Sequence, residues 1–233
     1  MEVITEAANE SSDLSAKADG DAGHRAEQKL SVYPALKRIM DIVFGTIGFV
    51  CLLPLMLIVK VSYWADGDKD SIFYTQTRVG LNGKPFQLIK FRTMVSDAEE
   101  ILKELLKDPA YAKEWEENQK LKRDPRITKM GKILRRTSLD EMPQFINVLK
   151  GEMSVIGPRP LVVGELEMHG GLELYNRVKP GITGWWGCNG RSNTTYEERL
   201  ELEYYYVKNC SLWLDARCFV KTIAVLIKRD GAK

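Results

Sequence analysis

The pattern of the chain includes one uninterrupted apolar run, Ile42 to Val59, which carries no charged residue. At a rise of about 1.5 Å per residue, such a run forms a helix of roughly 27 Å, just short of a hydrocarbon core of about 30 Å. A buried core helix would also be apolar. However, a run without charge on any face is unusual in a domain of this size, and it favours insertion into a membrane.

Two features of this run bear on whether it crosses the bilayer. Pro54 lies inside it, where proline removes a backbone hydrogen bond and favours a bend. Lys37 and Arg38 precede the run and Lys60 follows it, so the positive charges give no clear orientation. We therefore expect a helix that enters one leaflet and returns, with residues 34–64 as the membrane-inserted segment.

The pattern differs on either side of the run. Residues 1–33 are rich in Ala, Ser, Asp, Glu and Gly without an apolar period, which predicts a disordered polar tail. After the run, Ser71 to Val79 and Phe86 to Phe91 are rich in β-branched and aromatic residues, and a Gly-Leu-Asn-Gly turn separates them. These two segments predict a β-hairpin.

Helical patterns dominate the rest of the chain. Those expected are 96–106, 111–121, a short helix capped by Thr128, 162–178, a helix that starts at Thr194 or Thr195 and runs through Tyr206, and 211–228. The last one has an apolar stripe beside basic residues, so it could lie on a membrane surface or pack internally. The expected fold class is α+β, mainly helical with a small β-hairpin, in a monotopic membrane protein with interfacial amphipathic helices. Residues 65–233 would form its cytoplasmic domain.

Composition narrows the function. The 233 residues are 44% hydrophobic and 28% charged, as in globular proteins, and their net charge is +2. Without the acidic residues 1–33, the body keeps 31 basic and 25 acidic residues, which suits anionic partners. The two histidines and the four cysteines without a CxxC pair disfavour a zinc site and Ser-His catalysis.

The strongest candidate chemistry lies at Asp140-Glu141, which follow Arg135-Arg136. A capping box formed by Ser138 and Glu141 is one explanation, but it would put Pro143 at the fifth helical position. A helix that starts at Asp140 accommodates Pro143 in its first turn, and its positive end would keep Asp140 ionised. Adjacent acids near fixed cations also fit phosphoryl transfer, in which a carboxylate can be the nucleophile or hold Mg²⁺. The residues that could meet this demand are Lys90, Arg92, Arg135, Asp140, Glu141 and Arg159.

A set of motifs in this order resembles one family. They are QTRVG, KFRTM, LKRDPRITKMGKILRRTSLDEMPQFINVLKGEMSVIGPRP, VKPGITGWW, NGR and YYVKN. Together with the apolar helix and its central proline, they resemble the bacterial sugar transferases, the monotopic phosphoglycosyl transferases that prime cell-envelope glycan assembly.

The resemblance implies a mechanism and its residues. Asp140 would attack the β-phosphate of a UDP-hexose, release UMP and form a sugar-phosphoryl aspartate, which undecaprenyl phosphate would then accept. Glu141 would hold Mg²⁺, and Lys90, Arg135 and Arg159 would contact phosphates. Arg191 of the NGR motif would help to bind the nucleotide. The enzyme would act at the cytoplasmic face of the bacterial inner membrane with a re-entrant helix, and a homodimer stays an open alternative.

The sugar and two other classes of function remain open. The RDPRIT stretch and the KTIAVLIKRDGA ending resemble the galactose-1-phosphate subgroup of exopolysaccharide and O-antigen or capsule synthesis. Gly187 stands where many members have glutamine, and transfer of glucose-1-phosphate or N-acetylhexosamine-1-phosphate remains an alternative. A non-catalytic membrane-anchored scaffold would need the basic residues but not Asp140. A nucleic-acid partner is not expected, because the basic residues lack interleaved stacking aromatics.

Overall fold

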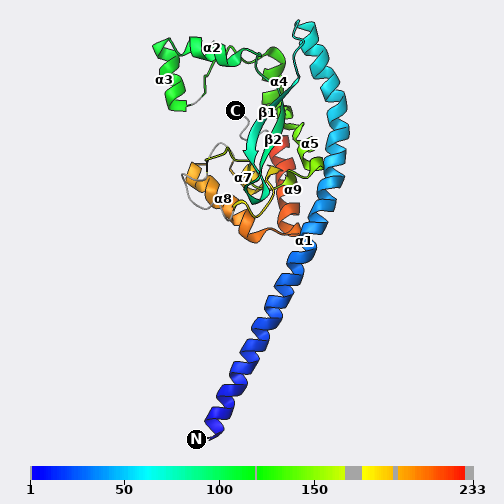
Figure 1. Ribbon diagram of the computed structural model, residues 1–233, viewed down its shortest axis with the longest axis vertical. Coiled ribbons are helices and arrows are strands. Elements are labelled where there is room, and N and C mark those ends of the chain that lie inside the picture. The colour runs from blue at the N-terminus through cyan, green and yellow to red at the C-terminus, as the bar shows by residue number, and fades with distance from the viewer. Residues whose placement is uncertain (1, 119, 166–174, 191–193, 229–233) are drawn as a thin grey trace. The chain divides into compact units, whose positions relative to one another are not determined.

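The computed structural model describes residues 2–118, 120–165, 175–190 and 194–228 (Figure 1). Helix α1 spans Glu2–Ala65, and the chain divides between Met40 and Asp41 into two units. The first unit is formed by the start of α1, and the second holds all other elements. Residues 2–33, which were expected to be a disordered tail, lie within α1, and the expected boundaries at residues 33 and 64 stay predictions.

The apolar part of α1 has the surface of a membrane-inserted helix. Among the described helices, its Val32–Ala65 part is long and apolar enough to cross a membrane, and α1 continues through Pro54. From Asp41 onward one face is buried and the other exposes large apolar side chains, namely Ile42, Val43, Ile47, Val50, Leu53, Leu57, Ile58, Val61 and Trp64. Such a face costs free energy in water and suits association with a membrane, whereas re-entry stays a prediction.

The predicted hairpin is confirmed. Strand β1 spans Phe73–Val79 and pairs antiparallel with β2, Pro85–Phe91, across the short 3-10 helix η1, Leu81–Gly83. Lys90 pairs with Tyr74 near one end of the hairpin, and Arg78 pairs with Phe86 near the other. Because side chains alternate along strands, Lys90, Tyr74 and Arg78 lie on the same face.

The predicted helices between residues 96 and 137 are present with small changes in their bounds. Helix α2 spans Ala98–Leu105, α3 spans Pro109–Asn118 and α4 spans Lys129–Thr137. The cap of α4 is confirmed, since the Thr128 side chain accepts a hydrogen bond from the Gly131 amide. The acid pair then lies in the 3-10 helix η2, Leu139–Glu141, before α5, Gln144–Lys150.

A second, parallel pair of strands was not predicted. Strand β3, Ser154–Ile156, pairs with β4, Gly181–Thr183, and the short helix α7, Trp185–Asn189, follows. Helix α8, Tyr196–Asn209, starts after a capping box at Thr195, and α9 spans Leu212–Lys228, both close to prediction. The helix expected over 162–178 is wrong at both ends, since residues 163–165 and 176–177 form turns, and residues 166–174 lie outside the described residues.

From Asp41 onward, α1 is seated on α5 and α9 (Figure 1). A Cβ atom on Gly48 would lie 2.5 Å from the Phe145 ring, so only glycine allows this close approach to α5. Phe44 packs on Phe219 of α9 with ring centroids 5.0 Å apart. The buried Asp41 carboxylate accepts hydrogen bonds from Ser154 Oγ at 2.8 Å and the Val155 amide at 2.9 Å. The apolar helix is therefore fixed to the segments that follow the acid pair.

Candidate active site

The acid pair is positioned by a reversal of the chain at Ser138. This residue ends α4 in the left-handed region with φ 56° and ψ 20°, a conformation that is uncommon for a residue other than glycine. Its amide donates to the Arg135 carbonyl at 3.2 Å, and its side chain makes no cap hydrogen bond. The capping box from Ser138 to Glu141 and a helix start at Asp140 are therefore both wrong. Helix α5 begins only after Pro143, which has helical dihedral angles but no N–H to donate.

Lys90 and Glu141 form the central ion pair of the site. Lys90 Nζ lies 2.8 Å from Glu141 Oε1, and the two side chains are 26% and 39% exposed. The strand β2 thus meets η2, although the two residues are far apart in the sequence. The pair is open to solvent and can exchange partners with an arriving anion.

The pKa of Asp140 is raised above its usual value. Burial raises the pKa of its half-buried carboxyl, and the negative charge of Glu141 raises that pKa further. Lys90 and Arg135 act in the opposite direction but do not cancel these effects. The expectation that a helix N-terminus would favour the ionised form is thus not met, because no helix starts at Asp140. These four residues, Lys90, Arg135, Asp140 and Glu141, are called the acid-pair cluster below.

The Arg135 side chain is positioned by Thr93, a residue that the sequence analysis did not predict. Its Nε donates to Thr93 Oγ1 at 2.9 Å, while the residue as a whole is exposed. The Thr93 carbonyl accepts from the Thr128 amide at 3.0 Å, so the end of β2 and the start of α4 are held together. Thr93 is part of the KFRTM motif, and that motif was the available signal.

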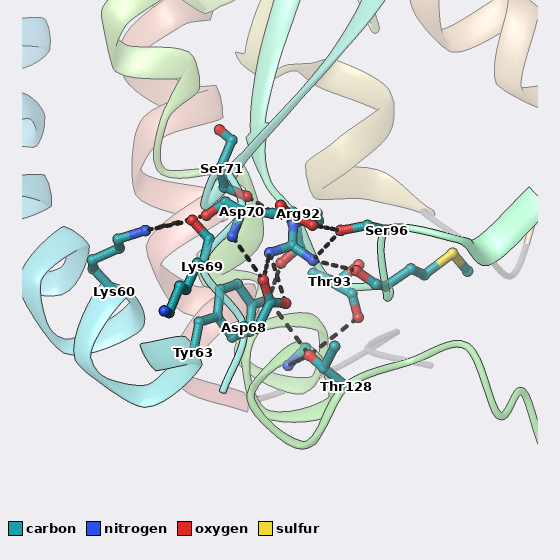
Figure 2. Close-up of polar contacts among 12 residues, drawn as sticks. Lys60, Tyr63, Asp68, Lys69, Asp70, Ser71, Arg92, Thr93, Ser96 and Thr128 are labelled. Atoms are coloured by element: carbon teal, nitrogen blue, oxygen red, sulfur yellow. Dashed lines mark hydrogen bonds and ion pairs between the residues drawn. The ribbon is translucent and has the colours of Figure 1, made fainter. Parts of the chain in front are cut away.

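Arg92 occupies a different environment from its neighbours (Figure 2). Its Nε donates to the Ser71 carbonyl at 2.7 Å, its Nη1 to the Met94 carbonyl and Ser96 Oγ at 3.3 and 3.2 Å, and its Nη2 to Asp68 Oδ1 at 2.9 Å. Its side chain is only 10% exposed. These contacts favour a structural role over the expected phosphate contact.

Tyr63 and Asp68 complete the surroundings of Arg92. The Tyr63 hydroxyl, at the end of α1, donates to the Arg92 carbonyl, and the guanidinium lies 4.9 Å from the centroid of the Tyr63 ring. Partial burial raises the pKa of Asp68, but the Asp70 amide and Arg92 outweigh that effect, so the net pKa is lowered. The end of the apolar helix is therefore tied to the strand that carries Lys90.

Arg159 lies in another group of residues. Its guanidinium carbon lies 5.5 Å from the centroid of the Trp186 ring, and its amide donates to Glu203 Oε1 at 3.1 Å. The charged residues that act most on the pKa of Asp140 are Glu141, Lys90 and Arg135 rather than Arg159. Arg191 lies outside the described residues, so its expected contact with the nucleotide stays a prediction.

The fit of Mg²⁺ to the acid pair depends on its oxygen donors. Among residues whose placement is described, no three His, Cys, Asp or Glu side chains are grouped to hold a metal ion. Mg²⁺ commonly binds one or two carboxylates and completes its shell with water and substrate phosphates. Asp140 and Glu141 lie close enough for one charge to raise the pKa of the other, and a cation would relieve this repulsion. The acid pair therefore fits such a partly protein-bound ion.

Comparison with known proteins defines the family. A family model described as bacterial sugar transferase matches residues 32–229, and the chain belongs to this family. It is 46% identical over 199 residues to the undecaprenyl-phosphate galactose phosphotransferase of Salmonella typhimurium and 45% identical to the UDP-galactose-lipid carrier transferase of Erwinia amylovora. Each match covers 84% of this chain but 41% of the relative, so the chain spans about two fifths of their length. The exopolysaccharide production protein ExoY of Sinorhizobium fredii is 42% identical, and the match covers 84% of this chain and 87% of ExoY.

Proposed function

We propose that this protein transfers hexose-1-phosphate from a UDP-hexose to undecaprenyl phosphate and releases UMP. The observation that carries the proposal is the half-buried Asp140 beside the Lys90–Glu141 ion pair and Arg135, in a chain that belongs to the sugar transferase family. The names of two relatives, which describe a galactose phosphotransferase and a UDP-galactose-lipid carrier transferase, support this reaction.

The first half-reaction forms a covalent intermediate on Asp140. A carboxylate oxygen forms a bond to the β-phosphorus, and the bond from that phosphorus to the bridging oxygen breaks. The bridging oxygen and its electron pair leave with UMP. Because the nucleophile must be ionised, the raised pKa of Asp140 makes this step sensitive to acid.

The second half-reaction regenerates the enzyme. A phosphate oxygen of undecaprenyl phosphate forms a bond to the same phosphorus, and the bond from phosphorus to the Asp140 oxygen breaks. The product is a hexose joined to the lipid through a diphosphate, and the carboxylate is restored. Asp140 is the nucleophile of the first half-reaction and the leaving group of the second, so a soluble donor and a membrane-bound acceptor react at one position in turn.

The neighbouring residues stabilise charge around the reacting phosphorus. Lys90 can exchange its contact with Glu141 for a phosphate oxygen, and Arg135 presents its remaining donors from an exposed position. Glu141 would hold Mg²⁺, which when bound supplies positive charge to the phosphate oxygens.

Galactose is the sugar that we favour. The two relatives at 46% and 45% identity carry galactose in their names, as the RDPRIT stretch and the chain's ending suggested. Such a transfer would be the first step of exopolysaccharide, O-antigen or capsule assembly. Glucose and N-acetylhexosamine are the alternatives that a panel of donors separates.

We place the reaction at the cytoplasmic face of the bacterial inner membrane, with α1 entering and leaving through that face. The exposed apolar face of α1 and the fixed position of Tyr63 support this arrangement. Cysteines introduced one at a time at Lys37 and Asp66, in a variant with Cys51→Ser and Cys210→Ser, test it by labelling intact cells. Protection of both positions from an impermeant thiol reagent is expected. Labelling of only one position would show a helix that crosses the bilayer.

The transfer reaction is tested by UMP release from UDP-galactose, UDP-glucose and UDP-N-acetylhexosamines in the presence of undecaprenyl phosphate and Mg²⁺. Without acceptor, the wild type should release one UMP per enzyme and retain the radioactive sugar phosphate covalently. Asp140→Asn should lose both signals, with turnover lowered by at least about 10⁴-fold.

The matched control is Asp97→Asn, which alters an exposed carboxylate that makes no cap hydrogen bond at the start of α2. Full turnover by Asp140→Asn would contradict the nucleophile assignment. Restored polysaccharide synthesis by Asp140→Asn in a deletion strain, at normal protein level, would support the scaffold alternative and contradict the proposed transferase.

A further inference from the structure

Three arginines converge at the opposite end of the hairpin from the acid pair. Arg78 lies near the end of β1, Arg159 in the GPRP turn and Arg199 on α8. The Val79 amide donates to the Leu161 carbonyl at 3.0 Å, which joins the end of β1 to the segment after Arg159. We call Arg78, Arg159 and Arg199 the arginine cluster.

One aromatic ring holds two of these guanidiniums together. The guanidinium carbons of Arg159 and Arg199 lie 5.5 and 5.2 Å from the centroid of the Trp186 ring. Arg159 is exposed, whereas Arg78 and Arg199 are partly buried. Solvent can therefore reach the cluster from the side of Arg159.

Several buried donors of the cluster make no hydrogen bond in the part of the chain that the structure describes. Within the described residues, Arg78 Nε, Arg199 Nε and Arg199 Nη2 are buried and make no hydrogen bond. Arg199 Nη2 lies 3.3 Å from Glu165 Oε1, but without the geometry of a hydrogen bond. Buried donors without an acceptor cost free energy, so an anion with several oxygens would stabilise this arrangement.

The charges of the cluster are also unbalanced. Two acids among the described residues act on these arginines, namely Glu165 and Glu203. Burial raises the pKa of Glu203 to about 7, so at neutral pH this carboxyl is partly protonated and compensates less than one positive charge. Burial and the nearby Arg159 lower the pKa of Arg78, as expected where positive charge is crowded. These two acids therefore leave more than one of the three positive charges uncompensated.

The backbone around Arg159 is rigid. The Tyr175 hydroxyl donates to the Arg159 carbonyl, and Glu203 Oε1 accepts from the Arg159 amide at 3.1 Å. Glu203 is 1% exposed and Tyr175 is 4% exposed, so both contacts are shielded from water. The turn is held by its main chain, which leaves the guanidinium of Arg159 available to a ligand.

Arg78 lies on the same face of the hairpin as Lys90 but at its opposite end. Arg78 lies four residues along β1 from Tyr74, the partner of Lys90. At about 3.3 Å per residue, the two ends are roughly 13 Å apart along the strand. The two phosphates of a nucleotide sugar are directly bonded through one oxygen, so they cannot both be centred at the two ends.

We infer that the arginine cluster is a second phosphate-binding site, which holds a phosphate monoester while the acid pair carries out the chemistry. This inference rests on the proposed function, because that reaction has two phosphate monoesters, the released UMP and the lipid acceptor. A monoester carries a charge of about −1.5 to −2 near neutral pH, which matches the excess positive charge better than one phosphate of a diester does.

Fluorescence of Trp186 in the full-length protein in nanodiscs gives a local readout of binding. Titration with UMP alone should produce a saturable change that is absent in Trp186→Phe. Arg78→Gln and Arg199→Gln should each raise the dissociation constant for UMP by at least about tenfold. Arg123→Gln, which removes an exposed arginine elsewhere, should leave it unchanged.

A second set of nanodiscs identifies the source of the phosphate. A Trp186 signal with undecaprenyl phosphate and no nucleotide assigns the site to the lipid acceptor, and a signal with UMP alone assigns it to the nucleotide product. Absence of a Trp186-dependent signal with UMP, inorganic phosphate and undecaprenyl phosphate would overturn the inference.

Arg159→Gln keeps the test informative if the Arg78→Gln or Arg199→Gln variant fails to fold. Its side chain is exposed and its hydrogen bonds use the main chain, so this variant loses only the packing on Trp186. It should keep a melting temperature close to that of the wild type and still bind phosphate at least about tenfold more weakly. Wild-type affinity in Arg159→Gln and in folded Arg199→Gln would refute the second site.

The test separates the second site from the transfer reaction. Asp140→Asn should bind UMP like the wild type, since no turnover is involved. If wild type transfers sugar phosphate but shows no Trp186 signal, only the second site fails. If Asp140→Asn transfers sugar phosphate and the signal persists, only the nucleophile assignment fails.

Discussion

The acid-pair cluster and the arginine cluster lie along the same face of one hairpin, yet they differ in the state of their cations. Lys90 is already paired with Glu141 at 2.8 Å, and Arg135 already donates to Thr93. In the arginine cluster, by contrast, buried donors of Arg78 and Arg199 have no acceptor among the described residues. Both groups are basic in sequence, but of the two only the arginine cluster has buried donors that make no hydrogen bond among the described residues.

This difference separates two tasks. A cation that is paired with a carboxylate can exchange this contact for a phosphate oxygen during the reaction. It can pair with the carboxylate again when the product leaves. Donors without a partner favour whatever anion arrives and do not depend on its chemistry. We therefore assign phosphoryl transfer to the acid-pair cluster and retention of a phosphate to the arginine cluster.

The largest contrast is expected between Arg135 and Arg199. Arg135→Gln should lower kcat by about 10²-fold with little change in KM for the UDP-hexose, because it removes a donor from the reacting phosphate. Arg199→Gln should act chiefly on inhibition by UMP or on KM for the lipid. Steady-state kinetics of both variants, with Arg136→Gln as control, check this split. Equal losses of kcat in the two variants would indicate that both clusters belong to one site.

Arg92 tests whether a basic residue near the acid pair acts through stability. Arg92→Met should lower the free energy of unfolding by about 3 kcal/mol, because Asp68 and two carbonyls lose a buried partner. Denaturation in detergent measures this, with the exposed Arg136→Met as control. If Arg92→Met has wild-type stability but no turnover, Arg92 contacts phosphate instead of supporting the fold.

The pH profile of turnover probes the acid-pair cluster itself. Burial and then Glu141 raise the pKa of Asp140, so turnover should rise with pH as this carboxyl ionises. Glu141→Gln removes the repulsion and should move the acid limb of kcat/KM to lower pH, whereas Lys90→Met should move it to higher pH. Shifts in the same direction for both variants would show that another group controls the limb.

Glu203 gives the smallest expected effect, on stability within the arginine cluster. Burial raises its pKa from 4.5 to about 7, so the folded state keeps a proton that the unfolded state releases between these values. Wild-type stability should therefore fall as pH rises through this window. Glu203→Gln should be more stable than wild type by at most about 3 kcal/mol near pH 8 and by much less near pH 5.

The melting temperatures of Glu203→Gln and of the exposed control Glu197→Gln, measured at both pH values, check this expectation. A pH-independent gain would mean that packing, rather than ionisation, limits the wild type.

The parts of the fold that sequence predicted have local causes. The hairpin follows from two β-rich segments around a glycine turn, and the starts of α4 and α8 follow from the side-chain caps Thr128 and Thr195. The pairing of β3 with β4 joins segments separated by more than twenty residues and has no local signal. The start of α5 was misplaced because Pro143 fits several positions in a first turn, and the left-handed Ser138 decided among them.

The candidate site shows the same limit at the level of single side chains. Lys90, Asp140 and Glu141 were grouped by motif, and the structure brings them into one cluster. Arg92 and Arg135 look equivalent in sequence, but only the contacts of β1, β2 and α4 distinguish a buried support from an exposed donor. Sequence can name the chemistry that a motif carries, while three-dimensional contacts decide which cation takes part.

The close seating of Gly48 on Phe145 has a consequence for regulation by lipids. Phe145 follows the acid pair by four residues, so a tilt of α1 is transmitted to α5 without an intervening flexible side chain. Bilayer thickness is one determinant of the tilt of an inserted helix. Under the proposed function, membrane composition would thereby tune the geometry of Asp140, and the rate of sugar-phosphate transfer would follow the physical state of the membrane that carries the product.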